Sequence, residues 1–241
     1  MIISNAHKFI FIKTNKTAGS SFEGLLSHYL KAGDWVTKAQ REEEEYRTAA
    51  LKGAKVQYFD GKGAPQGRII KQHARLLTAQ KRFPESKNFL SFGVLRNPFD
   101  RVISSFRWRK QGYIKRILNE DLGLERKQEI LKDRFLEYII YDQGDLNARG
   151  INLLFGVDRR GNSWSVDYIF KLENLKKAKS ILRAQLGLKV DLEQMPRFKE
   201  NTIKLPPEIN LWDTKTIRAA TNMFSWEFSN LGYPANPVSL Q

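Results

Sequence analysis

Six consecutive residues near the start of the chain have the side chains that bind a phosphate or sulfate group: Lys16, Thr17, Ala18, Gly19, Ser20 and Ser21. Small residues let the backbone wrap closely around a ligand, while hydroxyls and N–H groups donate hydrogen bonds and the lysine adds a charge. The alternative is a capped helix start with an exposed Lys16. The order is not that of a Walker A loop, because Gly19 follows the lysine and no glycine precedes it closely.

A second cluster, Arg-Asn-Pro-Phe-Asp-Arg-Val-Ile-Ser-Ser, begins at Arg96. The planar fork of Arg96 suits a phosphate, and the hydroxyl of Ser104 can complete its coordination. Asn97 has the side chain of a helix N-cap, and Pro98 suits the first helical turn. The alternative is an ordinary helix N-terminus, with Arg101 paired to an acid on its surface.

Each cluster lies where an apolar run ends and a helical pattern begins. Short runs rich in Phe, Val and Ile predict buried strands at residues 8–13, 88–95 and 166–172. Alternating strands and helices predict an α/β fold, a single domain over residues 1–241 with a central parallel sheet flanked by helices. Ligands in such folds bind at the carboxyl ends of the strands, where both clusters would lie.

Other segments are expected to be helical or irregular. Residues 34–52, with the run REEEEYR, predict a charged helix whose acidic face is solvated, and residues 125–141 and 214–230 predict amphipathic helices. Gly187 can terminate a helix over residues 174–187. Residues 31–67 are the candidates for a lid or an insertion on the acceptor side.

Composition narrows the class of protein. Lys and Arg number 41 against 26 Asp and Glu, a net charge of +15 over 241 residues, which favours anionic partners such as nucleic acid, acidic glycan, anionic lipid or a phosphorylated cofactor. The absence of cysteine excludes a disulfide scaffold and a thiol nucleophile. No apolar run approaches the ~18–20 residues of a membrane span, and no signal-peptide pattern opens the chain. We therefore expect a cytoplasmic protein without membrane insertion.

Taken together, the KTAGSS and RNPFDRVISSF segments resemble the PAPS-dependent sulfotransferases, nearest to the glycan O-sulfotransferases with K-T-[GA]-[GS]-[ST]-S loops. The resemblance implies a P-loop-like strand-loop-helix in which residues 16–21 bind the 5′-phosphosulfate of PAPS. It also implies that Arg96 and Ser104 bind the 3′-phosphate. Asn15 stands where the family usually has proline.

The resemblance further implies sulfuryl transfer from PAPS to a hydroxyl acceptor, with PAP as product and no metal. Lys16 would neutralise the departing phosphate. His73, in KQHARL, matches a family histidine and is the expected general base, because histidine titrates near pH ~6.5. Glu173 is a distant second candidate. His7 is expected at the opposite sheet edge, and His28 in packing or at the surface.

Further expectations concern the residues that bind the acceptor and a loop that closes over the ligand. Arg75 would read an acidic acceptor, or is simply exposed. Arg197, Lys199 and Asn201 would close over donor or acceptor, because family members have a loop here. An anionic glycan suits the basic charge. The absence of cysteine and of a membrane anchor favours a bacterial or viral source over a Golgi-resident animal enzyme.

Three other functions stay open from the residues alone. A nucleic-acid-binding protein would use the charge and the basic-aromatic stretch 105–116, and its binding would depend strongly on salt. A nucleotide kinase would need Mg²⁺ and prefer ATP. An adaptor would keep the fold and lack the site groups.

Overall fold

The computed structural model describes residues 1–59, 69–142, 150–158, 160–198 and 203–237. The chain divides into two compact units. The sheet unit comprises Met1–Leu95 and Ala148–Phe198, and the helical unit comprises Arg96–Asn147 and Lys199–Gln241. Lys199 and Asn201 lie outside the described residues.

The sheet unit is built on a mixed sheet with the strand order β4-β3-β1-β2-β5-β8. Its strands are β1 (Ile2–Ser4), β2 (Phe9–Ile12), β3 (Trp35–Val36), β4 (Gln57–Tyr58), β5 (Leu90–Leu95) and β8 (Tyr168–Lys171). Strands β2, β5 and β8 run parallel, and β3 is parallel to β4. A central, mostly parallel sheet flanked by helices is therefore confirmed.

The start of the chain departs from a purely parallel arrangement. Strand β1 pairs antiparallel with both β2 and β3, because the segment Asn5–Lys8 turns the chain back after Ser4. Lys8 takes a left-handed conformation in this turn, with φ 55°. The apolar residues on either side of the turn are equally buried, so hydrophobicity alone did not reveal the hairpin.

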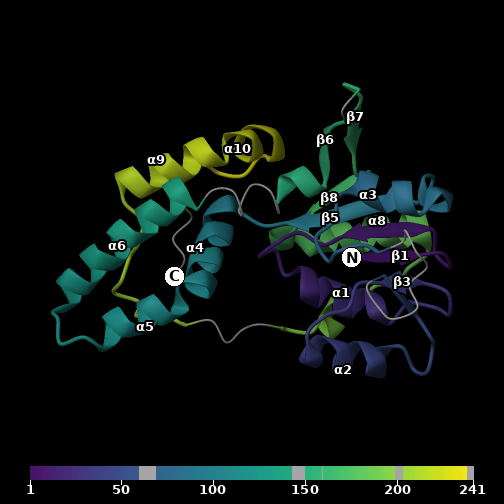
Figure 1. Ribbon diagram of the computed structural model, residues 1–241, viewed down its shortest axis with the longest axis horizontal. Coiled ribbons are helices and arrows are strands. Elements are labelled where there is room, and N and C mark those ends of the chain that lie inside the picture. The colour runs from purple at the N-terminus through teal and green to yellow at the C-terminus, as the bar shows by residue number, and fades with distance from the viewer. Residues whose placement is uncertain (60–68, 143–149, 159, 199–202, 238–241) are drawn as a thin grey trace. The chain divides into compact units, whose positions relative to one another are not determined.

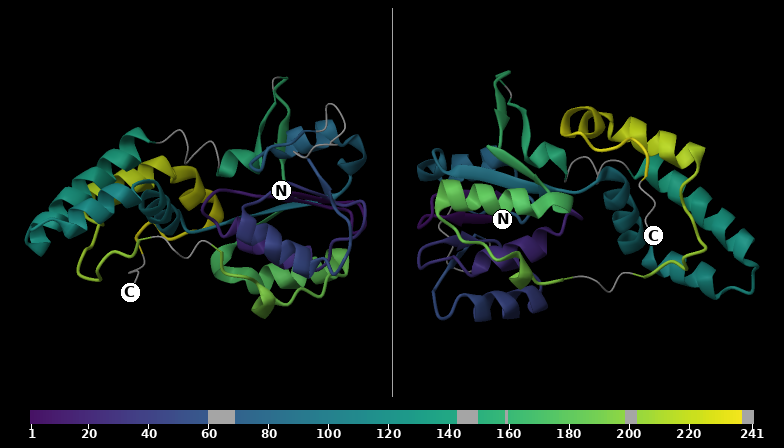
Figure 2. Two further views of the ribbon diagram at one scale, coloured as in Figure 1. Left: turned by 60° about the horizontal axis from the view of Figure 1, so that its bottom comes forward. Right: turned by 180° about the vertical axis from the view of Figure 1, so that it is seen from behind.

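Helices cover both faces of the sheet (Figure 1). Helices α1 (Gly19–Ser27) and α8 (Leu175–Leu186) pack on one face, where Phe11, Phe22 and Phe92 form part of the core. Helix α3 (Leu76–Arg82) lies on the opposite face, and α2 (Arg41–Ala50) lies outside α1. A hairpin of β6 (Phe155–Val157) and β7 (Ser163–Ser165) forms a separate two-stranded sheet, seen again in the views of Figure 2. Short 3₁₀ turns lie at Pro84–Ser86, Ile151–Leu153, Leu172–Asn174 and Leu192–Gln194.

The charged segment 34–52 differs from its sequence interpretation. It begins as strand β3, and α2 starts only at Arg41. Glu43 and Arg47 are 5% and 2% exposed, so a purely solvated acidic face is wrong. Both residues form buried ion pairs, Glu43 with Lys13 just after β2 and Arg47 with Glu23 in α1. Residues 31–59 thus contribute strands and a helix to the fold, and an acceptor-side role for the segment stays a prediction.

The helical unit has its own apolar core. Its helices are α4 (Pro98–Arg109), α5 (Gln111–Asn119), α6 (Leu124–Tyr141), α9 (Thr214–Met223) and α10 (Ser225–Leu231). The segment 214–230 forms two helices, because the chain departs from helical geometry at Phe224. Arg101 pairs in a bidentate manner with Glu227, at 2.8 and 2.6 Å, and both side chains are buried. Its partner is therefore an internal acid, where a surface acid was the alternative expected.

Candidate active site

The loop between β2 and α1 has the geometry of an anion-binding turn. Lys16 and Ala18 both take left-handed backbone conformations, with φ 59° and 55°. Such conformations cost about 1–3 kcal/mol for a residue with a Cβ, so the surrounding fold must hold them in place. Ala18 is the N-cap of α1 and has no side chain to cap the first-turn amides. The helix dipole and these amides favour an anion at this position.

The hydroxyl groups of the loop differ in what they contact. Thr17 is fully buried, and its Oγ1 lies 2.7 Å from Oγ1 of Thr14, whose hydroxyl also bonds the carbonyl of Val94. The Thr17 side chain therefore braces the loop against β5, which leaves its backbone to face a ligand. Ser21 accepts a hydrogen bond from the backbone N–H of Phe198 at 3.3 Å. Ser20 is buried to 8% exposure in the first turn of α1.

Gly19 explains how the loop fits against the end of β2. A Cβ on Gly19 would lie 2.8 Å from Cγ of Lys13 and 3.2 Å from the carbonyl oxygen of Thr14. A side chain at this position would push the lysine stem away. The glycine therefore allows the loop to close directly over Lys13.

His73 is brought to the same loop. Its Nδ1 lies 3.0 Å from the carbonyl oxygen of Lys13. A carbonyl only accepts hydrogen bonds, so Nδ1 carries the proton in the neutral ring and Nε2 keeps the lone pair. Burial lowers the pKa of His73, the Lys13 carbonyl opposes this, and the charge of Lys13 lowers the pKa again. The ring is therefore neutral at neutral pH, as a general base must be.

The second cluster lies at the start of the helical unit. Arg96 follows directly after the last residue of β5, and its Nε lies 3.7 Å from Oδ2 of Asp100. Asn97 caps α4 by accepting from the N–H of Phe99 at 2.9 Å, as predicted. Ser104 is half-buried one turn further along α4 than Asp100.

Arg107 is a candidate that the sequence reasoning missed. Burial lowers the pKa of its guanidinium, and the positive charge of Arg96 lowers it further, which means that the two cations lie near each other. Its Nε donates to the carbonyl of Ile203 at 2.6 Å. Arg107 lies three residues after Ser104, and this helical spacing puts both on one face of α4. This spacing between Ser104 and Arg107 is the feature of the sequence from which Arg107 could have been identified.

The segment that carries Arg197 packs against α1. A Cβ on Gly24 would lie 2.6 Å from Cγ of Pro196 and 3.0 Å from Cε2 of Phe198. Together with the Phe198–Ser21 hydrogen bond, these contacts hold the segment beside the first helix. Arg197 itself is exposed between the two packed residues.

The remaining candidate site residues lie at exposed positions, in a side-chain contact or in a turn. Arg75 is exposed at the N-cap of α3, and Glu173 is exposed just after β8. His28 donates to or accepts from the hydroxyl of Tyr46 at 2.9 Å, which fits a packing role. His7 lies in the turn before β2, at the edge of the sheet opposite the loop. These positions leave His73 as the histidine at the loop.

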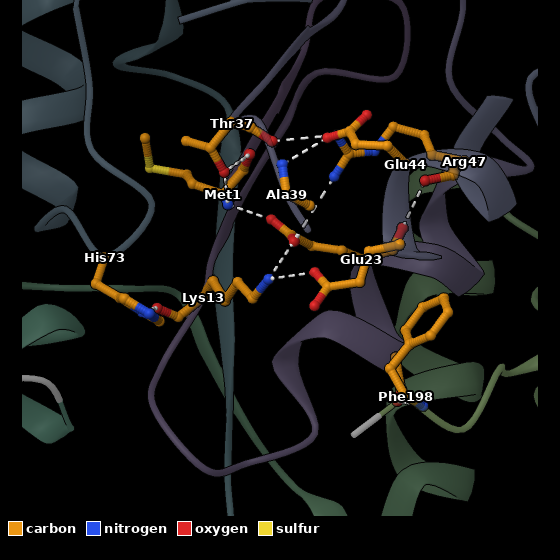
Figure 3. A network of polar contacts seen from close by, with 12 residues as sticks. Met1, Lys13, Glu23, Thr37, Ala39, Glu44, Arg47, His73 and Phe198 are labelled. Carbon is orange, nitrogen blue, oxygen red and sulfur yellow. Dashed lines mark hydrogen bonds and ion pairs between the residues drawn. The ribbon is translucent and has the colours of Figure 1, made fainter. Parts of the chain in front are cut away.

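A buried group of charges behind the loop was not foreseen (Figure 3). The ammonium of Lys13 lies 2.7 Å from Oε2 of Glu23 and 3.4 Å from Oε2 of Glu43. Arg47 approaches Glu23 at 3.8 Å and pairs with Glu44 at 2.8 Å. The Met1 amine also contacts Glu23. Lys13 is 10 and 30 positions away from its two carboxylate partners in sequence, a separation that no local pattern reveals.

Comparison with known proteins shows the family to which the chain belongs. The model of the Sulfotransferase family matches residues 1–234, so the chain belongs to that family. It is therefore an enzyme, a sulfotransferase, that transfers a sulfuryl group to a hydroxyl-bearing acceptor. No curated protein and no solved structure matches the chain. None of the helices in the described residues is both long and apolar enough to cross a membrane.

Proposed function

We propose that the enzyme transfers the sulfuryl group of PAPS and that the loop of residues 16–21 binds the 5′-phosphosulfate. The observation that carries this proposal is the pairing of a left-handed, glycine-containing loop with a histidine held at the carbonyl of Lys13, a residue just before the loop. Backbone amides at the start of α1 would bind the phosphosulfate oxygens, and Lys16 would meet the bridging oxygen.

The 3′-phosphate is assigned to Arg96 and Ser104, and we add Arg107 to this set. Two guanidinium groups that repel each other in a half-buried setting gain by sharing an anion. A dianionic phosphate fits them better than a carboxylate, since each arginine can offer two donors. Asp100 forms an ion pair with Arg96, but its single negative charge cannot neutralise both Arg96 and Arg107.

The reaction follows from these roles. Nε2 of His73 accepts the proton of the acceptor hydroxyl while the hydroxyl oxygen forms a bond to sulfur. The bond between sulfur and the bridging phosphate oxygen breaks, and Lys16 neutralises the charge that develops on that oxygen of PAP. The proton thus ends on His73, and the sulfuryl group ends on the acceptor. No step in this scheme requires a metal.

A carbohydrate acceptor is the substrate class that we propose, and an anionic glycan is favoured. The charge of +15 exceeds what one donor molecule neutralises, and it leaves surface cations for an acidic polymer. Arg75, exposed two residues after His73, is the nearest cation in sequence to the proposed base on its C-terminal side.

Calorimetric titration with PAP, 5′-AMP and ATP tests the donor assignment. We expect micromolar binding that needs the 3′-phosphate and is lost in Arg96→Ala. Lys115→Ala, which removes an exposed cation of α5, is the matched control and should bind PAP like the wild type. Binding that ignores the 3′-phosphate would overturn the assignment, and a preference for ATP with Mg²⁺ would point to phosphoryl transfer instead.

The acceptor class is tested with PAPS and a panel of chondroitin, desulfated heparin, a neutral oligosaccharide and p-nitrophenol. Formation of PAP together with a sulfated polysaccharide is the expected result. Sulfation of p-nitrophenol alone would contradict a glycan acceptor and leave the donor assignment intact.

A further inference from the structure

The residue that holds the proposed base is itself anchored from inside the fold. Lys13 follows directly after β2, so its peptide lies beyond the backbone ladder that joins β2 to β5. Its side chain is 3% exposed and enters the space between α1 and α2. Lysine is almost never fully buried without a partner, which means that its ion pairs maintain this position.

The partners of Lys13 are equally buried. Glu23 and Glu43 form ion pairs with its ammonium group, and their side chains are 2% and 4% exposed. Arg47, 2% exposed, adds a second cation near Glu23. Each buried cation of this set therefore lies against at least one buried carboxylate. Burial by itself raises the pKa of Glu23, but the Met1 amine, Lys13 and Arg47 outweigh it and hold the pKa at about 2.

One residue thus joins the cluster to the proposed base. The ammonium of Lys13 is held by Glu23, its stem packs against Gly19, and its carbonyl accepts from Nδ1 of His73. We propose that Lys13 and Glu23 are positioning residues: their buried ion pair fixes the Lys13 peptide, and that peptide fixes the His73 ring with Nε2 as the proton acceptor. This proposal rests on the assignment of His73 as the base.

The alternative is that the ion pair only stabilises the packing of α1 and α2. In that case the Lys13 carbonyl would stay in place without the ammonium, since Thr14 is independently bonded to Val94. The two cases differ in the tautomer of His73. An imidazole that is not held prefers the proton on Nε2, whereas the Lys13 carbonyl requires it on Nδ1.

The test is long-range ¹H–¹⁵N NMR of the protein labelled with ¹⁵N-histidine, without any ligand. The chain has three histidines, and His73→Gln assigns the signal. We expect the wild type to show the Nδ1–H tautomer at His73. Lys13→Met should shift it to a mixture in which the Nε2–H tautomer is the larger part. Lys71→Met, which removes an exposed charge two residues from His73, is the matched control and should leave the tautomer unchanged.

A second variant covers the case in which Lys13→Met does not fold. Lys13→Met combined with Glu43→Gln removes one charge of each sign and leaves Arg47 and Glu23 as a balanced pair. It should show the same tautomer shift as Lys13→Met. Retention of the wild-type Nδ1–H tautomer in either folded variant would overturn the proposal.

Two further readouts separate this proposal from the assignment of His73 as base. Titration with PAP should give an affinity within twofold of the wild type in Lys13→Met, because the ammonium of Lys13 is directed to Glu23 and Glu43 and methionine keeps the apolar stem that Gly19 contacts. The titratable and charged groups that act on His73 are Lys13, the Met1 amine and Glu23. If His73→Gln transfers sulfate like the wild type while Lys13→Met still shifts the tautomer, the base assignment fails and the positioning by Lys13 stands.

Discussion

Substitution of Gly24 by alanine offers a sharp test of how the Arg197 segment packs. Gly24 lies in the interior of α1, and a methyl group there would lie 2.6 Å from Cγ of Pro196. A proline ring cannot rotate out of the way as a flexible side chain can. The segment that includes Arg197 and Phe198 must therefore move away from the helix.

The expected magnitude combines two opposing effects. Replacing a helical glycine by alanine stabilises a helix by about 1 kcal/mol, because the unfolded chain loses conformational freedom. Overpacking costs about 1–3 kcal/mol, so Gly24→Ala should lower the free energy of unfolding by about 0–2 kcal/mol. Gly112→Ala is the matched control, since Gly112 is also helical and a methyl group there would meet open space within 4 Å among the described residues. That variant should gain about 0.5–1 kcal/mol.

Urea denaturation measures the free energies of unfolding, and titration with PAP measures the consequence for the donor. Loss of one charge-assisted hydrogen bond from Arg197 should weaken PAP binding about tenfold in Gly24→Ala. Gly112→Ala should bind PAP like the wild type. If Gly24→Ala gains as much stability as Gly112→Ala, the close packing of Pro196 on α1 is wrong. If it loses stability but binds PAP normally, Arg197 is not a donor ligand.

Three further predictions concern the two clusters and the helical core. Arg107→Ala should weaken PAP binding about tenfold by calorimetry, and unchanged affinity would remove Arg107 from the 3′-phosphate site. His73→Gln should lower kcat by about 10²–10⁴ and leave PAP affinity within twofold of the wild type. The kcat of the wild type should rise with pH through an apparent pKa below 6.5, because burial lowers the pKa of His73 and its neutral form is the base. A kcat that falls over this pH range contradicts the role of His73 as base. Arg101→Met should lower the free energy of unfolding by about 3–5 kcal/mol, because it leaves the carboxylate of Glu227 buried without its partner. The double variant Arg101→Met with Glu227→Leu should recover most of this loss. If the single and double variants lose the same free energy of unfolding, Glu227 is not the buried partner of Arg101.

Local patterns were sufficient to predict the elements that carry the site. An apolar run followed by small polar residues and a helical pattern specified β2, the loop and α1, and the helix at Pro98 began where its N-cap indicated. Each of these features depends on residues within about one turn of helix or a few residues of strand, so one sequence contains the whole signal. The loop residues were predicted in this way and His73 through the family resemblance that those motifs carry, and their roles in donor binding and catalysis stay predictions.

Features that depend on distant residues were missed or misread. The burial of Glu43 and Arg47 depends on partners after β2 and in α1, and the same residues in isolation form an ordinary exposed helix. The role of Thr17 also depends on a distant group, because its partner Thr14 is bonded to Val94 in β5. The presence of a threonine or serine in the sequence therefore does not show whether its hydroxyl binds a ligand or stabilises the loop from inside.

The strained loop and the buried charges behind it are connected through Lys13. Lys16 and Ala18 occupy left-handed conformations that cost about 1–3 kcal/mol each, and a loop held only by its ends would relax out of them. Thr17 braces the loop from within, and Gly19 seats it on the stem of Lys13, which Glu23 holds. An anion-binding loop that is formed before the ligand arrives has little ordering entropy left to lose on binding. The apolar stem of Lys13 therefore supports the loop, whereas its ammonium, through the ion pair with Glu23, supports the position of His73.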